Sequence, residues 1–434
     1  MVVGEARARL RWSVLTSLVV SNYRSLGERV ELKLGRMTAL VGPNGAGKSN
    51  LADLIRFIAE CARPRGLDEA ISARNGFDSI LRQGSPRPSH LTLAIQVEGP
   101  EFLWAWRFTL VSSEETKFEV LNEQALSVLR VAIKPGTLPL VTAALDAFAE
   151  PSFTGSPVNA IAPHLGNAEH GLSFLSGGAL HLGGAMVRPT TRLQPSDRDL
   201  FLPYLEGSNT FFRDLPEWLC RMSVYSPSPG LLRSPQRLDT HRPLKTNGEN
   251  WASVLADMQD QAGGTELLVA LRHLVGDIQK FRVADLGGFL MPQFWHGKHV
   301  DDPGGYWLSA HQESEGTVRI AALLTALFQE PYLTLVGIEE PELAVHPGAM
   351  ALLFDYLKEA SSDSRSQVLL TTHSPDLLDL LDIDDVRIVE RRAGSTLVSA
   401  LDEDQRLAIR RRLFQPSEIL RSEGLRPAEG QVNG

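Results

Sequence analysis

The stretch Thr38–Leu51 reads TALVGPNGAGKSNL and carries the strongest structural signal in the chain. Its residues 42–49, GPNGAGKS, match the pattern G-x-x-x-x-G-K-[ST]. An apolar run, Met37–Val41, precedes the pattern, and a helix-like stretch, Leu51–Ala59, follows it. A loop of this kind between a strand and a helix is typical of a phosphate-binding site.

Each part of this loop has a physical role. The three glycines let the backbone turn tightly, so that successive N–H groups point into one concavity, and the helix that begins near Lys48 adds the positive end of its dipole. Lys48 is predicted to reach the β- and γ-phosphates, and the Ser49 hydroxyl to ligate Mg²⁺. The sequence therefore predicts a site for a nucleoside triphosphate and Mg²⁺. The predicted contacts are Gly42, Pro43, Asn44, Gly45, Ala46, Gly47, Lys48, Ser49 and Asn50.

Length and composition limit the class of protein. The chain has 434 residues, 43% hydrophobic and 22% charged, as expected for a globular protein with one large or two ordinary domains. Its apolar runs are too short to span a bilayer and its first residues lack a signal-peptide layout, so we expect a cytoplasmic protein without a membrane partner. Cys61 and Cys220 have no spacing that suggests a disulfide framework or a zinc site.

Hydrophobic periodicity predicts the organisation of the chain. We expect strands over 14–20, 30–34, 37–41, 91–97, 102–110 and 126–133, with a helix over 49–60. Residues 135–200 are rich in Gly, Pro and Ser and predict an irregular insertion, followed by helices over 211–222, 250–258 and 265–275 and by short strands and loops over 281–310. Helices over 315–329, 348–360 and 375–382 then alternate with strands over 332–338, 367–371 and 386–390.

This alternation favours a parallel sheet with crossover helices. The strands that should flank the phosphate loop come about 290 residues after it, which indicates one nucleotide-binding sheet with a large insertion. We therefore divide the chain into a first part of the head, 1–134, an inserted subdomain, 135–300, a second part of the head, 301–414, and a loose tail, 415–434.

Two later motifs supply candidate catalytic groups. Residues 333–342, LTLVGIEEPE, are an apolar strand that ends in adjacent carboxylates, with Glu339 as the candidate Mg²⁺ partner and Glu340 as the candidate base for the attacking water. Residues 368–375, VLLTTHSP, end another strand at His373, which is placed to contact the γ-phosphate or the water. Taken alone, His373 also fits a structural role beside a helix cap.

A third motif, Ser314-Glu315-Gly316-Thr317, precedes the predicted helical residues 318–329. A hydroxyl and a glycine at a helix start can bind an anion through the helix dipole. By itself this pattern is more typical of an ordinary helix cap.

Along the chain, these motifs come in the order phosphate loop, S-x-G before a helix, strand with two acids and strand with histidine, and this order resembles the head of an ABC-type ATPase. More closely, the chain resembles the RecF/SMC-like group of small bacterial AAA-type ATPases, relatives of the overcoming-lysogenization-defect (OLD) nucleases that lack a Toprim nuclease domain. The resemblance is detailed over 14–60 and 308–392. It implies an α/β P-loop NTPase fold of ABC/SMC head type, with a mixed central sheet, flanking helices and an inserted, mainly helical or irregular subdomain.

The resemblance also implies a head-to-tail homodimer with ATP at the interface. Ser314, Gly316 and Thr317 would contact the γ-phosphate held by the other subunit, and Gln83 would be the glutamine that senses Mg²⁺. The chain departs from the common signature at Glu313 and Glu315, which add negative charge where a triphosphate is expected.

These observations lead to three hypotheses. The first is a Mg-ATP-hydrolysing dimeric switch in bacterial DNA maintenance, DNA repair or defence against phage, with a separately encoded effector. The second is a nucleotide-sensing module with negligible turnover that regulates a partner protein, because a charged signature could fail to complete the site. The third is direct DNA contact by the basic segment 221–245 and the arginines near 63–87, although the net charge of −9 argues against a broadly basic surface.

Overall fold

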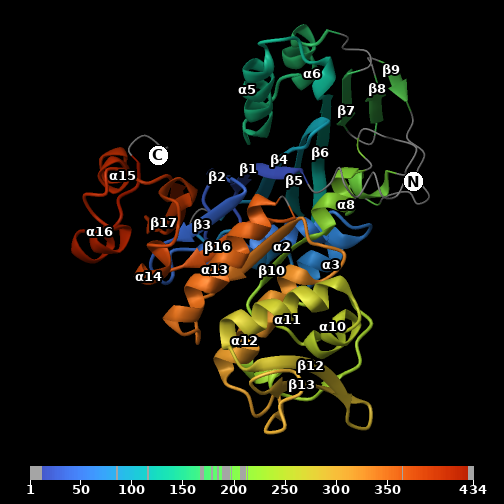
Figure 1. Cartoon of the computed structure of the whole chain (residues 1–434). Coiled ribbons are helices and arrows are strands. Elements are labelled where there is room, and N and C mark those ends of the chain that lie inside the picture. The colour runs from blue at the N-terminus through green and yellow to red at the C-terminus, as the bar shows by residue number, and fades with distance from the viewer. Residues whose placement is uncertain are drawn as a thin grey trace.

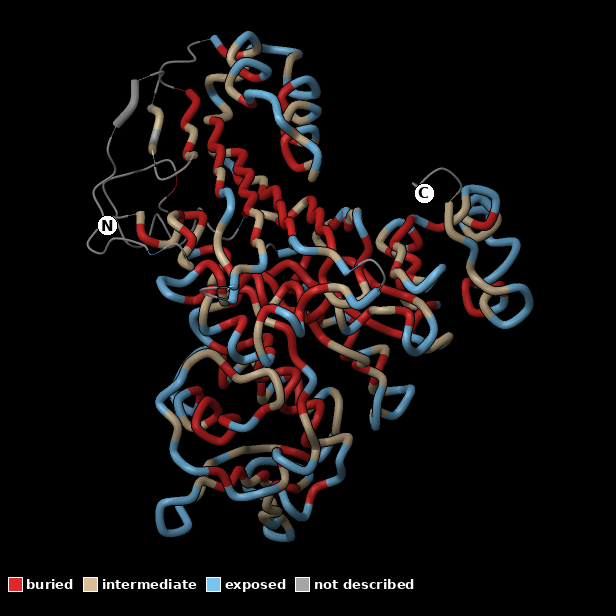
Figure 2. Tube along the Cα trace, turned by 180° about the vertical axis from the view of Figure 1, so that it is seen from behind, coloured by how far each residue is buried: buried red, intermediate tan, exposed pale blue. Residues whose placement is uncertain are grey.

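Three β-sheets organise the part of the chain that the structure describes. The structure is a computed structural model, and it describes residues 12–84, 87–114, 117–166, 171–176, 179–182, 185–187, 196, 198–205, 212, 214–363 and 365–428. A six-stranded sheet lies at the centre, with helices α5 and α6 above it and helices α10 to α12 below it in the view of Figure 1. Buried residues concentrate in this central region (Figure 2).

The central sheet confirms the predicted mixed α/β architecture. Its strand order is β10-β15-β16-β3-β17-β18, and all neighbours are parallel except β17 and β18. The strands are β3 (Met37–Val41), β10 (Met222–Tyr225), β15 (Leu335–Glu339), β16 (Gln367–Thr372), β17 (Val386–Arg392) and β18 (Ser395–Ser399). β3 and β16 are buried at every residue, as expected for parallel strands that are covered on both faces.

The two faces of this sheet belong to different cores. Leu40 and Leu369 pack in a core that includes helix α2 (Lys48–Cys61) and the eight-stranded sheet. Their neighbours Ala39 and Leu370 pack in the core on the other face, because successive side chains of a strand point to opposite sides. The helices of that second core include α10 (Trp251–Met258), α11 (Ala262–Val275), α12 (Glu315–Phe328), α13 (Pro347–Ser362) and α14 (Pro375–Leu378).

The eight-stranded sheet is antiparallel and has the order β2-β1-β4-β5-β6-β7-β8-β9. Its strands are β1 (Val14–Ser21), β2 (Val30–Lys33), β4 (His90–Glu98), β5 (Phe102–Ser113), β6 (Lys117–Leu129), β7 (Leu172–Ser176), β8 (Ala179–Leu182) and β9 (Ala185–Val187). Two short helices, α3 (Gly66–Ser72) and α4 (Phe77–Ile80), connect α2 to β4.

The expectation of an irregular stretch over 135–200 is wrong for much of its described part. Helix α5 (Leu138–Ala149) buries Val141, Leu145 and Phe148, which recur at helical spacing and pack with α6 (Pro157–Ile161) on β5 and β6. Strands β7 to β9 then extend the eight-stranded sheet. The abundant Gly, Pro and Ser obscured this helix, and the short strands depend on pairing with β6, which is distant in sequence.

Two further element predictions need correction. Strand β6 begins at Lys117, not near residue 126, because its polar first part also pairs with β5. Within that part, Glu123 is buried and accepts hydrogen bonds from the Trp106 side chain and the Leu202 backbone N–H. The predicted helix over 211–222 is a shorter helix, α8 (Asp214–Cys220), followed by β10, which pairs with β15 in the central sheet. Residues 211 and 213 lie outside the described part.

A smaller sheet lies below helices α10 to α12 in the view of Figure 1. It contains β11 (Gln236–Arg237), β12 (Ile278–Asp285), β13 (Phe289–His296) and β14 (Tyr306–Ser309), as expected for 281–310, and β13 is its central strand. Its strands β12 and β13 contact helices α10 and α11. This sheet therefore lies beside the helices that precede the signature segment.

The C-terminal part is more ordered than the predicted loose tail. Helix α15 (Glu403–Arg410) is followed by α16 (Pro416–Ser422), which packs against α14. The Ser417 hydroxyl donates a hydrogen bond to Asp379 at 2.6 Å, and Gln415 and Glu418 form a capping box at the start of α16. Among the described residues, no helix combines the length and the apolar character needed to cross a bilayer.

Candidate active site

The phosphate loop lies at the carboxyl end of β3 and leads into α2. Gly45 and Gly47 have positive φ angles of 76° and 111°, which glycine adopts readily. Gly47 is the N-cap of α2. It has no side chain that could accept a hydrogen bond from the first N–H groups of this 14-residue helix. The loop therefore has the geometry of an anion site.

Lys48 is folded back onto this loop. Its ammonium group donates hydrogen bonds to the carbonyl oxygens of Gly42 at 2.7 Å and Pro43 at 3.1 Å, and the residue is 5% exposed. Burial lowers the pKa of Lys48, whereas the nearby Glu340 and Glu342 act to raise it. The ammonium lies where phosphate oxygens could replace the two carbonyls as acceptors.

The other loop residues face solvent or the neighbouring turn. Pro43, Asn44 and Ser49 are exposed and Ala46 is buried. The Asn50 amide donates to the Ser25 hydroxyl at 2.6 Å. An exposed Ser49 hydroxyl at the start of α2 fits the predicted role of Mg²⁺ ligand beside a phosphate.

The acid pair follows β15 at the same edge of the sheet. Glu339 is opposite Thr371 in the register of β15 and β16, and Thr372 is opposite Val41 at the end of β3. The Glu339 carboxylate forms an ion pair with Arg56 of α2 at 3.3 Å. No local pattern points to this arginine, because the contact joins residues 283 positions apart.

Glu340 has an unusual backbone that is held from two sides. Its φ of 47° is left-handed, a costly conformation for a residue with a side chain. Its N–H donates to the carbonyl of Thr371 at 2.9 Å, and its carbonyl accepts from Arg319 at 3.0 Å. These bonds fix the position from which the carboxylate extends.

His373 lies next to Glu340. The imidazole Nδ1 is 3.3 Å from Glu340 Oε1, and the imidazole is 41% exposed. Glu342 supports this histidine, because its Oε1 accepts hydrogen bonds from the Thr372 hydroxyl at 2.6 Å and from the His373 N–H at 3.4 Å. The structure thus brings Lys48, Glu340 and His373 to one edge of the central sheet.

Glu342 is a residue of the site that was not among the catalytic candidates chosen from the sequence. Its Oε2 is buried without a hydrogen-bond partner among the described residues. The signal that could have identified it is the third acid in the sequence EEPE, two residues after Glu340.

The signature segment begins helix α12. The Ser314 hydroxyl caps the helix by accepting from the Thr317 N–H at 3.0 Å. A Cβ at Gly316 would lie 2.4 Å from the carbonyl oxygen of Ala344, so only glycine allows this close approach. Within the described residues, no hydrogen bond or ion pair joins this segment to the phosphate loop of the same chain.

Arg319 connects the signature helix to the acid pair. It is 4% exposed, and its guanidinium donates to the carbonyl oxygens of Glu339 and Glu340 at 3.2 and 3.0 Å and of Pro227 at 3.1 Å. Burial lowers the pKa of Arg319, against the opposing effect of Glu342 and Glu340. A movement of α12 would therefore act on the backbone of Glu339 and Glu340 through these hydrogen bonds.

The expected charge at Glu313 is not directed at the nucleotide. Glu313 is 6% exposed and its carboxylate is 2.6 Å from His296 Nε2. The Glu315 side chain is exposed and lies 3.7 Å from Arg233. The expectation that both acids add charge near a triphosphate therefore needs correction for Glu313, because its side chain turns into the protein.

Gln83 lies beside a turn that borders the phosphate loop. Its amide nitrogen donates to the carbonyl oxygens of Asp78 at 3.1 Å and Leu81 at 3.2 Å. The adjacent Arg82 N–H donates to the carbonyl of Asn22, near the Ser25 that binds Asn50. No described hydrogen bond or ion pair joins Gln83 to Ser49 or Glu339.

Several basic side chains of segment 221–245 contact acidic or aromatic side chains of the same chain. Arg233 faces Glu315, Arg242 pairs with Asp257 at 2.5 Å, and Lys245 pairs with Glu249 at 2.8 Å. Arg237 lies over the ring of Phe289. These partners reduce the positive charge that the segment could offer to DNA.

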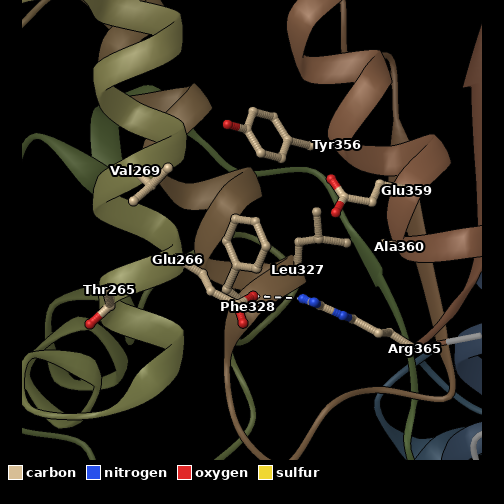
Figure 3. A pocket seen from close by; sticks show the side chains of 9 residues that line it. All are labelled: Thr265, Glu266, Val269, Leu327, Phe328, Tyr356, Glu359, Ala360 and Arg365. Carbon is tan, nitrogen blue, oxygen red and sulfur yellow. Dashed lines mark hydrogen bonds and ion pairs between the residues drawn. The ribbon is translucent and has the colours of Figure 1, made fainter. Parts of the chain in front are cut away.

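A pocket of about 260 Å³ lies between α11, α12 and α13 (Figure 3). Its lining combines the apolar Val269, Leu327 and Phe328 with an ion pair between Glu266 and Arg365 at 2.6 Å. Leu327 and Phe328 end α12, so the pocket is about 20 Å along the helix from Ser314 at 1.5 Å per residue. It is separate from the candidate active site.

Comparison with known proteins identifies relatives that share parts of this chain. The OLD nuclease of Thermus scotoductus (strain ATCC 700910 / SA-01) is 24% identical over 426 residues, which cover 91% of this chain and 66% of the nuclease. The chromosome partition protein Smc of Desulfitobacterium hafniense (strain Y51) is 44% identical over 45 residues, which cover 10% of this chain and 4% of that protein. The chain thus spans less than two thirds of the length of either relative.

Solved structures of Smc heads are also similar. The Smc head domain with an extended coiled coil bound to the C-terminal domain of ScpA, from Pyrococcus furiosus, has 12% identity and a TM-score of 0.46, covering 92% of this chain and 99% of that chain. The SMC head domain from Thermotoga maritima has 13% identity and a TM-score of 0.40, covering 89% and 99%.

A family model described as "AAA domain, putative AbiEii toxin, Type IV TA system" matches residues 37–100 and 221–379. These ranges include the phosphate loop, the signature segment, the acid pair and His373, and they make up just over half of the chain. The protein therefore belongs to this family of P-loop AAA ATPase domains.

Proposed function

We propose that this chain hydrolyses Mg-ATP and acts as a dimeric molecular switch. The observation that carries the proposal is the meeting of three distant segments at one edge of the central sheet. There, Lys48 lies in the phosphate loop after β3, Glu340 follows β15, and His373 follows β16, with 3.3 Å between Glu340 Oε1 and His373 Nδ1. Such a set of a phosphate cradle, a base and an orienting histidine fits phosphoryl transfer to water.

We assign each residue of the site a separate role in this reaction. The N–H groups at the start of α2 and the Lys48 ammonium hold the phosphates, and Glu340 accepts a proton from the attacking water. His373, fixed by Glu342, holds the Glu340 carboxylate through Nδ1 and offers its other ring nitrogen to the water or the γ-phosphate. Ser49 and Glu339 would hold a Mg²⁺ ion, which would supply positive charge to the phosphate oxygens, and Gln83 would be the residue that senses this ion.

The Glu339 carboxylate already has a partner, which would have to shift before Glu339 could bind a metal ion. Its carboxylate pairs with Arg56, and that arginine also faces Asp53 at 3.6 Å. In our proposal Glu339 would loosen its ion pair with Arg56 in order to hold a Mg²⁺ ion, directly or through a water. Binding of Mg-ATP would then loosen a contact between α2 and β15.

The dimer completes the site. Because Ser314, Gly316 and Thr317 have no described bond to the phosphate loop of their own chain, we assign them to the γ-phosphate held by a second copy, head to tail. ATP binding closes the dimer and hydrolysis opens it. Arg319 couples the position of the signature helix to the acid pair of the same chain, because it donates hydrogen bonds to the carbonyl oxygens of Glu339 and Glu340.

We place this switch in bacterial DNA maintenance, DNA repair or defence against phage, acting on a separately encoded effector. The description of the family names a toxin of a toxin–antitoxin system, and one relative is named a nuclease. The alternative of a nucleotide sensor with negligible turnover was motivated by Glu313 and Glu315. It is less favoured because the Glu313 carboxylate is buried against His296.

The substitution Glu340→Gln tests this function. We expect ATP turnover to fall about 10²- to 10⁴-fold, the usual effect of losing a general base. Nucleotide binding should persist, and sizing in the presence of Mg-ATP should show a stable dimer that the wild-type protein forms only transiently. Glu359→Gln, an exposed carboxylate on α13, is the matched control and should leave turnover unchanged. Undiminished turnover in Glu340→Gln would exclude Glu340 as the base.

A further inference from the structure

The residue that precedes the signature serine is held by a buried histidine. Glu313 Oε1 lies 2.6 Å from Nε2 of His296, at the end of β13, and both side chains are less than 10% exposed. The Glu313 N–H donates to the carbonyl of Ser309 at 3.2 Å. The small sheet is thus tied to the turn that places Ser314.

A second carboxylate completes the arrangement. His296 Nδ1 lies 2.9 Å from Asp277 Oδ2, in the connection between α11 and β12. Tyr306 of β14 stacks on the imidazole with a centroid distance of 5.7 Å, and the residue of β12 paired with His296 is the apolar Ile278. The titratable groups that face His296 are therefore Asp277, Glu313 and the phenol of Tyr306.

The distances determine how many protons this cluster must hold. A neutral imidazole has one N–H, which can be donated to Asp277 from Nδ1. A second proton must then lie between Nε2 and Glu313, on either partner, because a lone pair facing an ionised carboxylate at 2.6 Å would be repulsive in a buried place. Both arrangements contain the same number of protons.

We propose that His296 is a positioning residue for the signature segment. In this proposal, which rests on the proposed function, the Asp277–His296–Glu313 cluster holds residues 313–317 in the form that completes the site of the second copy. Loss of one proton leaves the imidazole a single N–H for two carboxylates, so one of the two contacts becomes repulsive and the cluster holds the segment less firmly. The cluster therefore makes closure of the dimer dependent on pH.

The directions of the pKa shifts agree with retention of this proton. Burial by itself lowers the pKa of His296, but the hydrogen bonds to Asp277 and Glu313 outweigh it, so this pKa lies above its usual value. Burial raises the pKa of Glu313, against the effect of His296. A histidine pKa that folding raises stabilises the fold fully below the unfolded value of 6.5, and this contribution is lost as the pH rises through the folded value.

The test compares His296→Ala and Glu313→Gln in the Glu340→Gln background, which traps the closed dimer. With Mg-ATP at about pH 6, His296→Ala should need about tenfold more protein for half-dimerisation, the effect of losing one charged hydrogen bond. ATP binding by the isolated monomer, measured with a fluorescent analogue, should not change. Glu313→Gln can donate its amide N–H to a neutral imidazole, so it keeps the contact without the titrating proton.

The pH profile separates positioning from a merely structural role. Between about pH 6 and about pH 9, dimerisation should weaken about tenfold when Glu313 is present and stay flat in Glu313→Gln. His299→Gln, an exposed residue after the same strand, is the control and should follow the parent profile. A parent profile parallel to that of Glu313→Gln, or unchanged dimerisation in His296→Ala, would overturn the proposal.

A second measurement keeps the cluster testable if the protein does not dimerise with ATP. That result would refute the proposed dimeric switch. The cluster would then be judged by thermal unfolding, where the stability of the wild type relative to Glu313→Gln should fall as the pH rises from about 6 to about 9. A difference that does not change with pH would refute the shared proton.

Discussion

At the scale of single residues, two glycines of the phosphate loop are required for different reasons. Gly45 and Gly47 both have a positive φ, but a Cβ at Gly45 would meet no atom within 4 Å. A Cβ at Gly47 would lie 2.1 Å from Thr396 Oγ1. That hydroxyl is held by hydrogen bonds to the Ala46 carbonyl and the Ser25 hydroxyl, so it cannot move aside freely.

This difference predicts unequal effects of two similar substitutions. Gly45→Ala should destabilise the fold by about 1 kcal/mol, the cost of a left-handed residue with a side chain. Gly47→Ala should cost about 1–3 kcal/mol more, because it adds a steric clash in a packed region. Thermal unfolding without nucleotide measures both. Equal losses of stability would show that Thr396 does not restrict the loop.

At the scale of elements, a buried carboxylate anchors helix α2 behind the phosphate loop. The Asp53 carboxylate accepts a hydrogen bond from Tyr23 at 2.6 Å and pairs with Arg74 at 3.0 Å and Arg24 at 2.9 Å. Burial acts to raise the pKa of Asp53, but Arg74, Tyr23 and Arg24 outweigh it and lower this pKa. One residue thus joins α2 to the turn after β1 and to the end of α3.

We therefore expect Asp53→Asn to destabilise the protein by about 2 kcal/mol or more, because it removes one of the two carboxylates that face the buried Arg74 and leaves only Glu60. Asp68→Asn is the matched control. Asp68 pairs with Arg198 at an exposed site, and its loss should cost less than about 1 kcal/mol. Denaturant unfolding at neutral pH measures both changes.

The same anchor predicts an acid dependence. A carboxylate whose pKa is lowered by folding stabilises the native state above its unfolded pKa of 3.8, and this contribution is lost as the pH falls through the folded value. Asp53→Asn should therefore flatten the part of the stability curve below about pH 4. A curve as steep as that of the wild type would contradict the assignment.

At the scale of the whole molecule, the candidate nucleotide site consists of two groups of residues that lie in different parts of the fold. The phosphate loop, the acid pair and His373 gather at the edge of the central sheet. The signature segment begins α12 beside the loop that contains Ala344. A head-to-tail pair of chains would bring one group from each copy together at each of two equivalent sites.

Mixing two inactive variants tests this arrangement. Lys48→Ala disables a phosphate loop, and Ser314→Arg disables a signature segment. In a random mixture, half of the dimers contain both variants and have one intact site, so about a quarter of the wild-type turnover should return. A mixture of Lys48→Ala with the double variant has no intact site and should stay inactive. If the first mixture is also inactive, the two segments do not act in trans.

Local patterns in the sequence predicted much of the fold and the residues at the edge of the central sheet. The phosphate loop, the acids after β15 and the histidine after β16 each follow an apolar strand, and parallel strands bring their carboxyl ends to one edge. Helix α5 was missed because its apolar residues lie within a stretch rich in Gly and Pro. Strand β10 was missed because its four residues depend on pairing with β15, more than 100 residues away.

Side-chain orientation and long-range pairing were beyond the reach of these patterns. Nothing in the sequence around Glu313 shows that its carboxylate turns inward to His296, and Arg56 meets Glu339 only because α2 lies against β15. The amino-acid pattern thus specified the chemical groups and the strand ends that carry them. The packing of distant elements determined which charges are neutralised, because ion pairs and buried hydrogen bonds form between residues that periodicity cannot relate.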